Sequence, residues 1–238
     1  MNASMKFRLK VFTSACLAVL LCLLTVYAKD YWLAKPFAQW NEPETTAMLT
    51  DSPWSRPVSI PGSFGGAATP RVSQPGQLSG STLPQTRGLG GTEALKFYVR
   101  WYSSLKLRQG LGRMGQLRGG ASEADVNSFL QQSMEDYAIA ISAPMMEPFA
   151  NATFESLKPK TFLLSRKDKS KRIELKSYSS PKQRQDNFAV FFFPRSLNGQ
   201  PTIDPADDEI IFETEIGTTK IRANYKLSRM LVDGKLDL

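Results

Sequence analysis

The sequence contains no histidine, and its only two cysteines, Cys16 and Cys22, lie in an apolar stretch near the N-terminus. If that stretch is removed during export, the mature chain has neither an imidazole nor a thiol. This excludes Ser-His-Asp and Cys-His catalysis, zinc sites built from Cys and His, histidine-ligated haem and disulfide bonds. We therefore expect no cofactor and no metal centre.

The composition is otherwise ordinary. Of the 238 residues, 42% are hydrophobic and 22% are charged, and the formal net charge is +8. These values are typical of a globular protein and exclude a chain that is disordered throughout. A chain of this length is long enough to bury a core in one or two domains.

An export signal is predicted at the N-terminus. Lys6, Arg8 and Lys10 precede an uncharged and mostly apolar run over residues 11–27, which is typical of a signal peptide. The run is shorter than the ~20 residues of a transmembrane helix, and Ala28 offers a small residue for cleavage. Residues 1–28 are therefore interpreted as a signal peptide.

An uncleaved signal anchor over the same residues is the alternative. Tyr27, Tyr31 and Trp32 favour it, because aromatic side chains gather at membrane surfaces. Both interpretations deliver the rest of the chain out of the cytoplasm, to the periplasm or the medium. In the second, residues 11–27 also anchor the protein in the membrane.

Residues 29–56 are rich in aromatic side chains and include three of the four tryptophans. Asn41 and Glu44 have the spacing of a capping box, which predicts a short helix that ends at Thr50. Such a helix is marginal alone, so its aromatic side chains need a surface to pack on. Either Trp40 and Trp54 dock onto the main domain, or they bind another protein or the membrane surface.

Residues 57–92 consist mostly of Gly, Pro, Ser and Thr, and Arg71 and Arg87 are their only charged residues. This composition cannot build a core, so we predict a disordered linker. The folded body is then a single domain over residues 93–238.

The body combines alternating patterns typical of strands with three- and four-residue spacings typical of helices. Strands are expected at residues 95–101, 137–141, 162–164, 173–175 and 188–193. Helices are expected at residues 107–117, 122–137 and 147–157. The order of these elements predicts an α+β fold, with an antiparallel sheet of about six strands and two or three helices on one face.

The most specific structural prediction is a hairpin over residues 209–227 with its turn at Gly217-Thr218. In this register Glu213 and Glu215 face basic residues on one side of the strand pair. Phe212 then points to the core on the other side.

Charge is distributed unevenly along the body. Residues 158–184 contain ten basic and two acidic residues, whereas residues 201–215 contain six acidic residues and no basic one. The basic block suits anionic lipid headgroups or an anionic envelope polymer, and export argues against nucleic acid. The alternative is that the two blocks neutralise each other across the sheet. The candidate binding residues of the basic block are Lys167, Lys169, Lys171 and Arg172.

Two patterns leave an enzymatic alternative open. The loop 204–209 has carboxylates for calcium or for acid/base work, but it lacks the spacing of an EF-hand loop and an opposing carboxylate cluster. Ser103 and Lys106 have the Ser-x-x-Lys spacing of penicillin-binding enzymes, without the other motifs of those enzymes. A carboxylate- or Ser/Lys-dependent hydrolase is therefore the second hypothesis, with no catalytic residue assigned.

Several short motifs carry a family resemblance. They are Trp40, Leu49-Thr50-Asp51-Ser52-Pro53-Trp54, Val99-Arg100-Trp101, Leu107-Arg108-Gln109 and Gly234-Lys235-Leu236. At these positions the chain resembles a group of uncharacterised exported bacterial proteins labelled GWxTD-domain proteins. The likeness covers the aromatic segment and the body, although the motif Gly-Trp-x-Thr-Asp itself does not occur. The group implies no activity for any residue.

These observations predict a non-enzymatic, extracytoplasmic binding or assembly module of the bacterial cell envelope. Its expected partner is an envelope protein or an anionic envelope surface, either lipid headgroups or a polymer. The candidate binding residues are Trp40, Trp54, Lys167, Lys169, Lys171 and Arg172.

Overall fold

The computed structural model describes residues 30–60 and 94–238. The predicted signal and residues 61–92 of the predicted linker lie outside the described residues. The described parts combine helices with antiparallel sheets, so the predicted α+β class is confirmed. Among these residues, no helix combines the length and the apolar character needed to cross a bilayer.

The N-terminal part contains α2 (Tyr31–Ala34), a 3-10 turn (Phe37–Gln39), α3 (Glu42–Thr50) and β1 (Ser55–Ile60). The predicted capping box starts α3: Asn41 Oδ1 accepts a hydrogen bond from Glu44 N–H, and the Glu44 carboxylate accepts one from Asn41 N–H. Residues 57–60, predicted as linker, belong to β1 and pair with β2. The linker prediction is wrong at these residues, because Val58 and Ile60 pack against the core. The folded body therefore includes residues 30–60.

One sheet has five antiparallel strands in the order β1-β2-β3-β7-β6. After β1, its strands are β2 (Leu95–Trp101), β3 (Asp136–Ser142), β6 (Ser177–Ser179) and β7 (Ala189–Pro194). The predicted strands at 95–101, 137–141 and 188–193 are thus confirmed. The wholly apolar β7 lies between two neighbours, which satisfies its backbone groups on both sides.

A second sheet has four antiparallel strands in the order β11-β10-β4-β5. They are β4 (Phe162–Ser165), β5 (Arg172–Glu174), β10 (Glu209–Ile216) and β11 (Thr219–Lys226). The predicted hairpin register is confirmed, with Glu213 opposite Arg222 and Phe212 opposite Ala223. The ion pairs differ from the expected ones, because Glu213 reaches diagonally to Lys220 at 2.6 Å.

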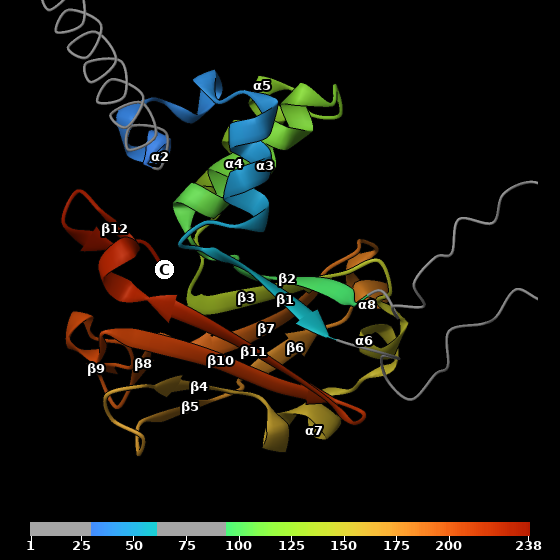
Figure 1. The fold of residues 1–238 in the computed structure, drawn as a ribbon, viewed down its shortest axis with the longest axis vertical. Coiled ribbons are helices and arrows are strands. Elements are labelled where there is room, and N and C mark those ends of the chain that lie inside the picture. The colour runs from blue at the N-terminus through green and yellow to red at the C-terminus, as the bar shows by residue number, and fades with distance from the viewer. Residues whose placement is uncertain (1–29, 61–93) are drawn as a thin grey trace, which may run out of the picture.

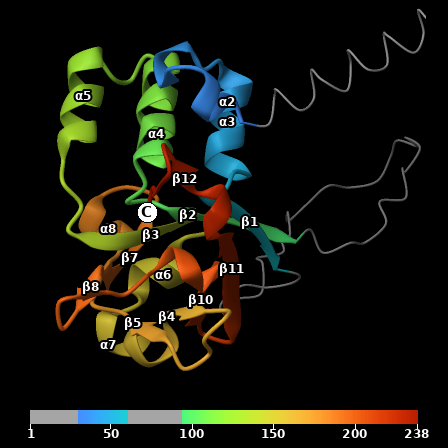
Figure 2. The ribbon, with the colours of Figure 1, turned by 90° about the vertical axis from the view of Figure 1, so that its left-hand side faces the viewer.

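The elements form three layers (Figures 1 and 2): α3, α4 (Leu105–Leu117) and α5 (Glu123–Gln131) lie above the five-stranded sheet, and the four-stranded sheet lies below it. The rings of Phe191 and Phe212 meet between the sheets with centroids 5.4 Å apart. Strands expected in one sheet of about six are therefore divided over two facing sheets. This arrangement buries the apolar faces of both.

The second predicted helix is shorter than its apolar stripe. It ends at Gln131, and Tyr137, which the stripe included, pairs with Phe193 in the sheet. The helix expected over 147–157 is divided into α6 (Glu147–Asn151) and α7 (Phe154–Leu157), because Thr153 caps a new start. The remaining elements are α8 (Pro181–Arg184), the hairpins β8 (Ser196–Leu197) with β9 (Gln200–Pro201) and β12 (Leu231–Val232) with β13 (Lys235–Leu236), and 3-10 turns at Lys158–Lys160, Pro205–Asp207 and Leu227–Arg229.

Candidate functional site

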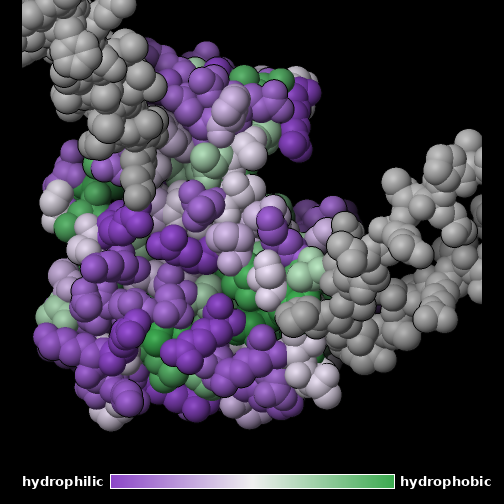
Figure 3. Space-filling view, in the orientation of Figure 1, coloured by the Kyte–Doolittle hydropathy of each residue, from purple (hydrophilic) through white to green (hydrophobic). Residues whose placement is uncertain are grey.

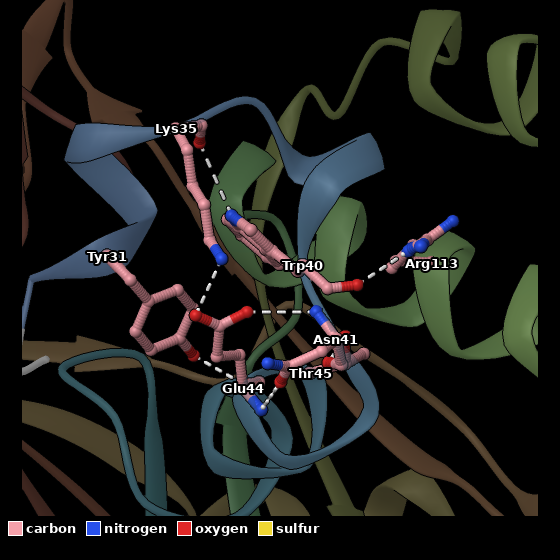
Figure 4. Close-up of polar contacts among 7 residues, drawn as sticks. All are labelled: Tyr31, Lys35, Trp40, Asn41, Glu44, Thr45 and Arg113. Atoms are coloured by element: carbon pink, nitrogen blue, oxygen red, sulfur yellow. Dashed lines mark hydrogen bonds and ion pairs between the residues drawn. The ribbon is translucent and has the colours of Figure 1, made fainter.

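Trp40 and Trp54 are both fully buried inside the chain. Trp40 Nε1 donates to the Lys35 carbonyl at 3.3 Å, and the Trp40 carbonyl accepts from Arg113 Nε at 2.8 Å (Figure 4). Trp54 Nε1 donates to the Asp237 carbonyl at 2.7 Å. The two rings dock onto the main domain, so the expectation that they bind a partner is corrected.

Tyr31 and Trp32 are also buried. The Tyr31 ring meets the Trp40 ring edge-on at 5.5 Å, and the Trp32 ring meets the Trp54 ring in the same way at 5.9 Å. The Tyr31 hydroxyl donates to the Glu44 carbonyl (Figure 4). These two side chains therefore do not form the aromatic belt at a membrane surface that favoured a signal anchor.

The predicted basic residues lie on the turn between β4 and β5 and at the start of β5. Lys171 Nζ pairs with Asp207 Oδ2 at 2.6 Å, and the Arg172 guanidinium lies 3.9 Å from the centroid of the Phe162 ring. The acidic block thus neutralises part of the basic block. Lys167 and Lys169 are exposed on the turn, and their role in binding stays a prediction.

Two carboxylates of the 204–209 loop accept hydrogen bonds from backbone N–H groups of the same loop. Asp204 Oδ1 accepts from Ala206 N–H, while Asp207 Oδ2 accepts from Asp204 N–H and from Lys171. Burial, the largest single influence, raises the pKa of Asp207, but the hydrogen bonds from Asp204 N–H, Lys171 and Ser165, together with the charge of Lys171, outweigh it and hold the pKa below its usual value. No cluster of His, Cys, Asp or Glu suited to a metal occurs in the described ranges.

The Ser-x-x-Lys pair is not assembled as a nucleophile and a base in the described structure. Ser103 is buried, and its Oγ accepts a hydrogen bond from the Ala138 N–H of β3 at 3.1 Å. Lys106 donates its backbone N–H to Asp237, whose carboxylate also accepts from Ser104 Oγ and so caps the start of α4. These contacts anchor the C-terminal residues to α4.

Arg100 of β2 is a further candidate binding residue, which the sequence did not predict as one. Only 7% of its surface is exposed, because α3 and α4 cover its face of the sheet. Arg100 Nε donates to the Leu49 carbonyl at 2.6 Å, and Nη1 donates to Ser142 Oγ. Its guanidinium carbon lies 5.2 Å from the centroid of the Tyr98 ring and 5.8 Å from that of Phe188. Each of these four neighbours is neutral.

No carboxylate in the described residues forms an ion pair with Arg100. The pKa of its guanidinium is influenced by burial and by Tyr225 and Tyr98, and by no acidic side chain. Arg100 therefore has no acidic ion-pair partner among residues 30–60 and 94–238.

The C-terminal end of α3 offsets part of this charge. Leu49 lies in the last turn of α3, where backbone carbonyls lack partners within the helix and the helix dipole carries about half a negative charge. Burial lowers the pKa of Arg100 to about 10, which still leaves the guanidinium protonated at neutral pH. This offset is partial, so the guanidinium keeps part of its positive charge without compensation from the described residues.

Arg108 of α4 shows the contrasting arrangement. It is buried to a similar extent, and its Nη1 and Nη2 donate to the carbonyls of Gln132 and Phe129. Burial, the main influence, lowers its pKa, while the charge of Asp237 acts in the opposite direction. Arg108 thus has an acidic side chain in its surroundings and a structural role in holding α5 to α4.

Arg100 lies in the wall of a groove of about 760 Å³. On one side the groove is bounded by α3 and α4, and on the other by β2, the residues that follow β3 and the loop 185–188. Figure 3 shows the surface indented on its right side, between the helices above and the sheets below. Leu111, Met114 and Phe188 make much of the lining apolar, and Arg118 adds an exposed cation. This size and lining are typical of small-molecule sites.

A second hollow of about 320 Å³ adjoins the groove and shares Leu111, Asp186 and Phe188 with it. It lies between α4 and α5 and is lined mainly by apolar side chains, including Val126 and Phe129. Asp186 carries the carboxylate at the junction, and Arg184 holds it at 2.9 Å.

The sequence contained a signal for Arg100. Tyr98, Arg100 and Tyr102 occupy the face of the strand opposite Val99 and Trp101. A cationic side chain between two aromatic side chains on the same face of a strand can be shielded by them from water. The burial itself depends on α3 and α4, which no pattern within β2 indicates.

Comparison of the chain with known proteins gave no matching family model, no matching curated protein and no matching solved structure. The resemblance to GWxTD-domain proteins therefore stays a prediction. Function has to be argued from the groove and from the sequence.

Proposed function

We propose that this protein is a non-enzymatic binding module of the bacterial cell envelope, and that its groove binds an anionic ligand at Arg100. The observation that carries the proposal is the buried guanidinium without a carboxylate partner. Burial of a charge without a counter-charge is costly, and an anion in the groove reduces that cost.

The donors of Arg100 support the same proposal. A guanidinium has five N–H groups, of which one on Nε and one on Nη1 are used by Leu49 and Ser142. Three N–H groups are left for a ligand, and Arg–carboxylate pairs are among the stronger hydrogen-bonded pairs. Arg118, exposed in the same groove, adds a positive potential that attracts anions.

Binding rather than catalysis is supported by the hydroxyl groups of the lining. Ser142 Oγ accepts from Arg100, and Thr50 Oγ1 donates to the Thr46 carbonyl within α3. Thr46 and Tyr98 also line the groove, and among the described residues none of these four hydroxyl groups is hydrogen-bonded to a carboxylate that would act as a base. The carboxylate of Asp186 is engaged by Arg184 and by the Phe188 N–H.

The location outside the cytoplasm is supported by the sequence of residues 6–28 alone. Fusion of residues 1–28 to a reporter enzyme that is active only after export tests it, and the mass of the purified protein tests cleavage. We expect an active reporter and a mature chain that begins at Lys29. An inactive reporter would contradict the export proposal, whereas an uncleaved chain would support the signal anchor.

The anion site is tested by NMR on the purified protein. The Arg100 Nε–H signal, identified by its loss in Arg100→Gln, is followed while acetate is added and while chloride is added at equal ionic strength. We expect a saturable shift with acetate and a smaller, non-saturating one with chloride. Arg222→Gln removes one positive charge from an exposed position on β11 and should leave the response unchanged.

A signal that does not distinguish acetate from chloride would contradict the proposal. If Arg100→Gln does not fold, Ala143→Phe replaces it, because Ala143 lines the groove and a phenyl ring there fills the space while the guanidinium stays in place. The acetate response should then be lost with the fold intact.

A further inference from the structure

We infer that the ligand is an apolar chain ending in a single carboxylate, as in a fatty acid, with the carboxylate at Arg100 and the chain in the hollow between α4 and α5. This inference rests on the proposed anion site and specifies the chemistry of its ligand.

A head with one negative charge fits the groove better than a dianion. Arg100 contributes one buried positive charge, already offset in part by the end of α3. Asp186 lines the same groove but is paired with Arg184 at 2.9 Å, so this pair supplies no net positive charge for a second negative charge on the ligand. Arg118 is exposed, so water and salt screen its attraction. A carboxylate also matches the planar fork of a guanidinium.

The path of the chain follows from the side chains shared by the two hollows. Phe188 lies beside the Arg100 guanidinium and beside the Tyr102 ring of the second hollow, at 5.8 and 6.3 Å. A chain that leaves the carboxylate along Phe188 and Leu111 therefore enters the space lined by Val126 and Phe129. Asp125, Arg184 and Asp186 also line this space, but Asp125 accepts hydrogen bonds from Ser122 and Arg184 pairs with Asp186. Most of the remaining lining is apolar, which favours methylene groups.

Glycines of α4 lie at close contacts beside the second hollow. A Cβ atom on Gly112 would lie 2.7 Å from Val126 Cγ1, and one on Gly115 would lie 3.1 Å from Ala121 Cβ. α4 thus lies close to α5 and to the residues that precede α5, and the hollow beside these contacts is limited to about 320 Å³. A lipid with two chains is a poorer fit.

The test measures the affinity of the purified protein for acetate, butanoate, octanoate and dodecanoate by calorimetry. The affinity should rise roughly fourfold for each added methylene until the hollow is full. Dodecylamine, with the same chain and a cationic head, should bind at least tenfold more weakly than dodecanoate. Arg100→Gln should weaken dodecanoate binding by roughly tenfold to a hundredfold, and Arg222→Gln should not change it.

Ala121→Phe separates the chain from the head. Ala121 is partly exposed and lines only the second of the two hollows, so a phenyl ring there occupies the space of the chain. The variant should lose roughly tenfold or more in dodecanoate affinity and keep the acetate response of Arg100. Ala143→Phe should abolish both and serves in place of Arg100→Gln if that variant does not fold.

Each contrary result has its own meaning. Affinity that is independent of chain length, with the acetate shift at Arg100 intact, would overturn this inference and leave the proposed anion site standing. Loss of all monocarboxylate binding, acetate included, would overturn both. Equal binding of dodecylamine, or much tighter binding of dodecyl phosphate, would overturn the single-carboxylate ligand in favour of an unspecific apolar surface or a dianion.

Discussion

The substitution Trp54→Ala measures how firmly the N-terminal segment belongs to the body. Trp54 is fully buried, its Nε1 donates to the Asp237 carbonyl at 2.7 Å, and its own carbonyl accepts from Trp101 N–H. It joins three parts of the chain that are far apart in sequence. Truncation of its ring therefore affects the contact of β1 with the rest of the fold.

The expected loss follows from these contacts. Truncation of a buried tryptophan to alanine costs about 3–5 kcal/mol, and loss of the hydrogen bond to the partly buried Asp237 carbonyl costs about 0.5–1.5 kcal/mol. Since the first figure already contains part of the second, we expect the free energy of unfolding to fall by about 4–6 kcal/mol. This is about a quarter or more of the ~5–15 kcal/mol that stabilises a typical domain.

The assay is urea unfolding followed by far-ultraviolet circular dichroism, which does not depend on the fluorescence of the removed ring. Trp54→Phe keeps an aromatic ring but removes the N–H donor and part of the volume of the indole, so it should lose about 1–3 kcal/mol. Leu33→Ala, in the same segment but 54% exposed, should change stability by less than ~0.5 kcal/mol.

A Trp54→Ala variant as stable as Leu33→Ala would contradict this prediction. It would mean that the aromatic segment does not pack on the body. Its rings would then be free for a partner, as the second sequence-based interpretation holds.

Three further predictions concern the body. Phe212→Ala should cost about 3–5 kcal/mol, and Glu213→Ala about 0.2–1 kcal/mol, in urea unfolding; equal losses would contradict the register of the hairpin. A protease that cuts between the two described parts of the chain should leave two pieces that co-elute in gel filtration, because β1 pairs with β2; separation of the pieces would contradict that pairing. Asp207→Asn should be less stable than the natural protein at pH 7, because the pKa of Asp207 is lowered in the folded state. That difference should shrink as the pH falls below about 4, where the carboxylate of the natural protein takes up a proton; a difference that grows in acid would contradict the lowered pKa.

The sequence alone determined those features that depend on residues close together in the chain. The capping box of Asn41 and Glu44 predicted the start of α3, because its hydrogen bonds join positions three apart. Gly217 predicted the turn of the hairpin, because a turn with positive φ favours glycine. In the structure its φ is 59°. The alternation of apolar and polar residues then determined which side of β10 faces the core.

The tertiary structure alone decided how these elements cover one another. Residues 57–60 have a linker-like composition, yet they form a strand because β2 offers a partner and the core accepts Val58 and Ile60. Tyr137 fits both the apolar spacing of a helix and the alternation of a strand. Its pairing with Phe193 in the sheet decided for the strand. Such choices depend on contacts between distant residues, which a local pattern does not contain.

The candidate site shows the same division. The sequence placed Arg100 on the polar face of a strand, where a cation is ordinarily solvated. Only the packing of α3 on that face, through the Leu49 carbonyl, removes the guanidinium from water and leaves its charge without a carboxylate. The residue type determines the charge, but the free-energy cost of that charge depends on how far the rest of the fold excludes water from it.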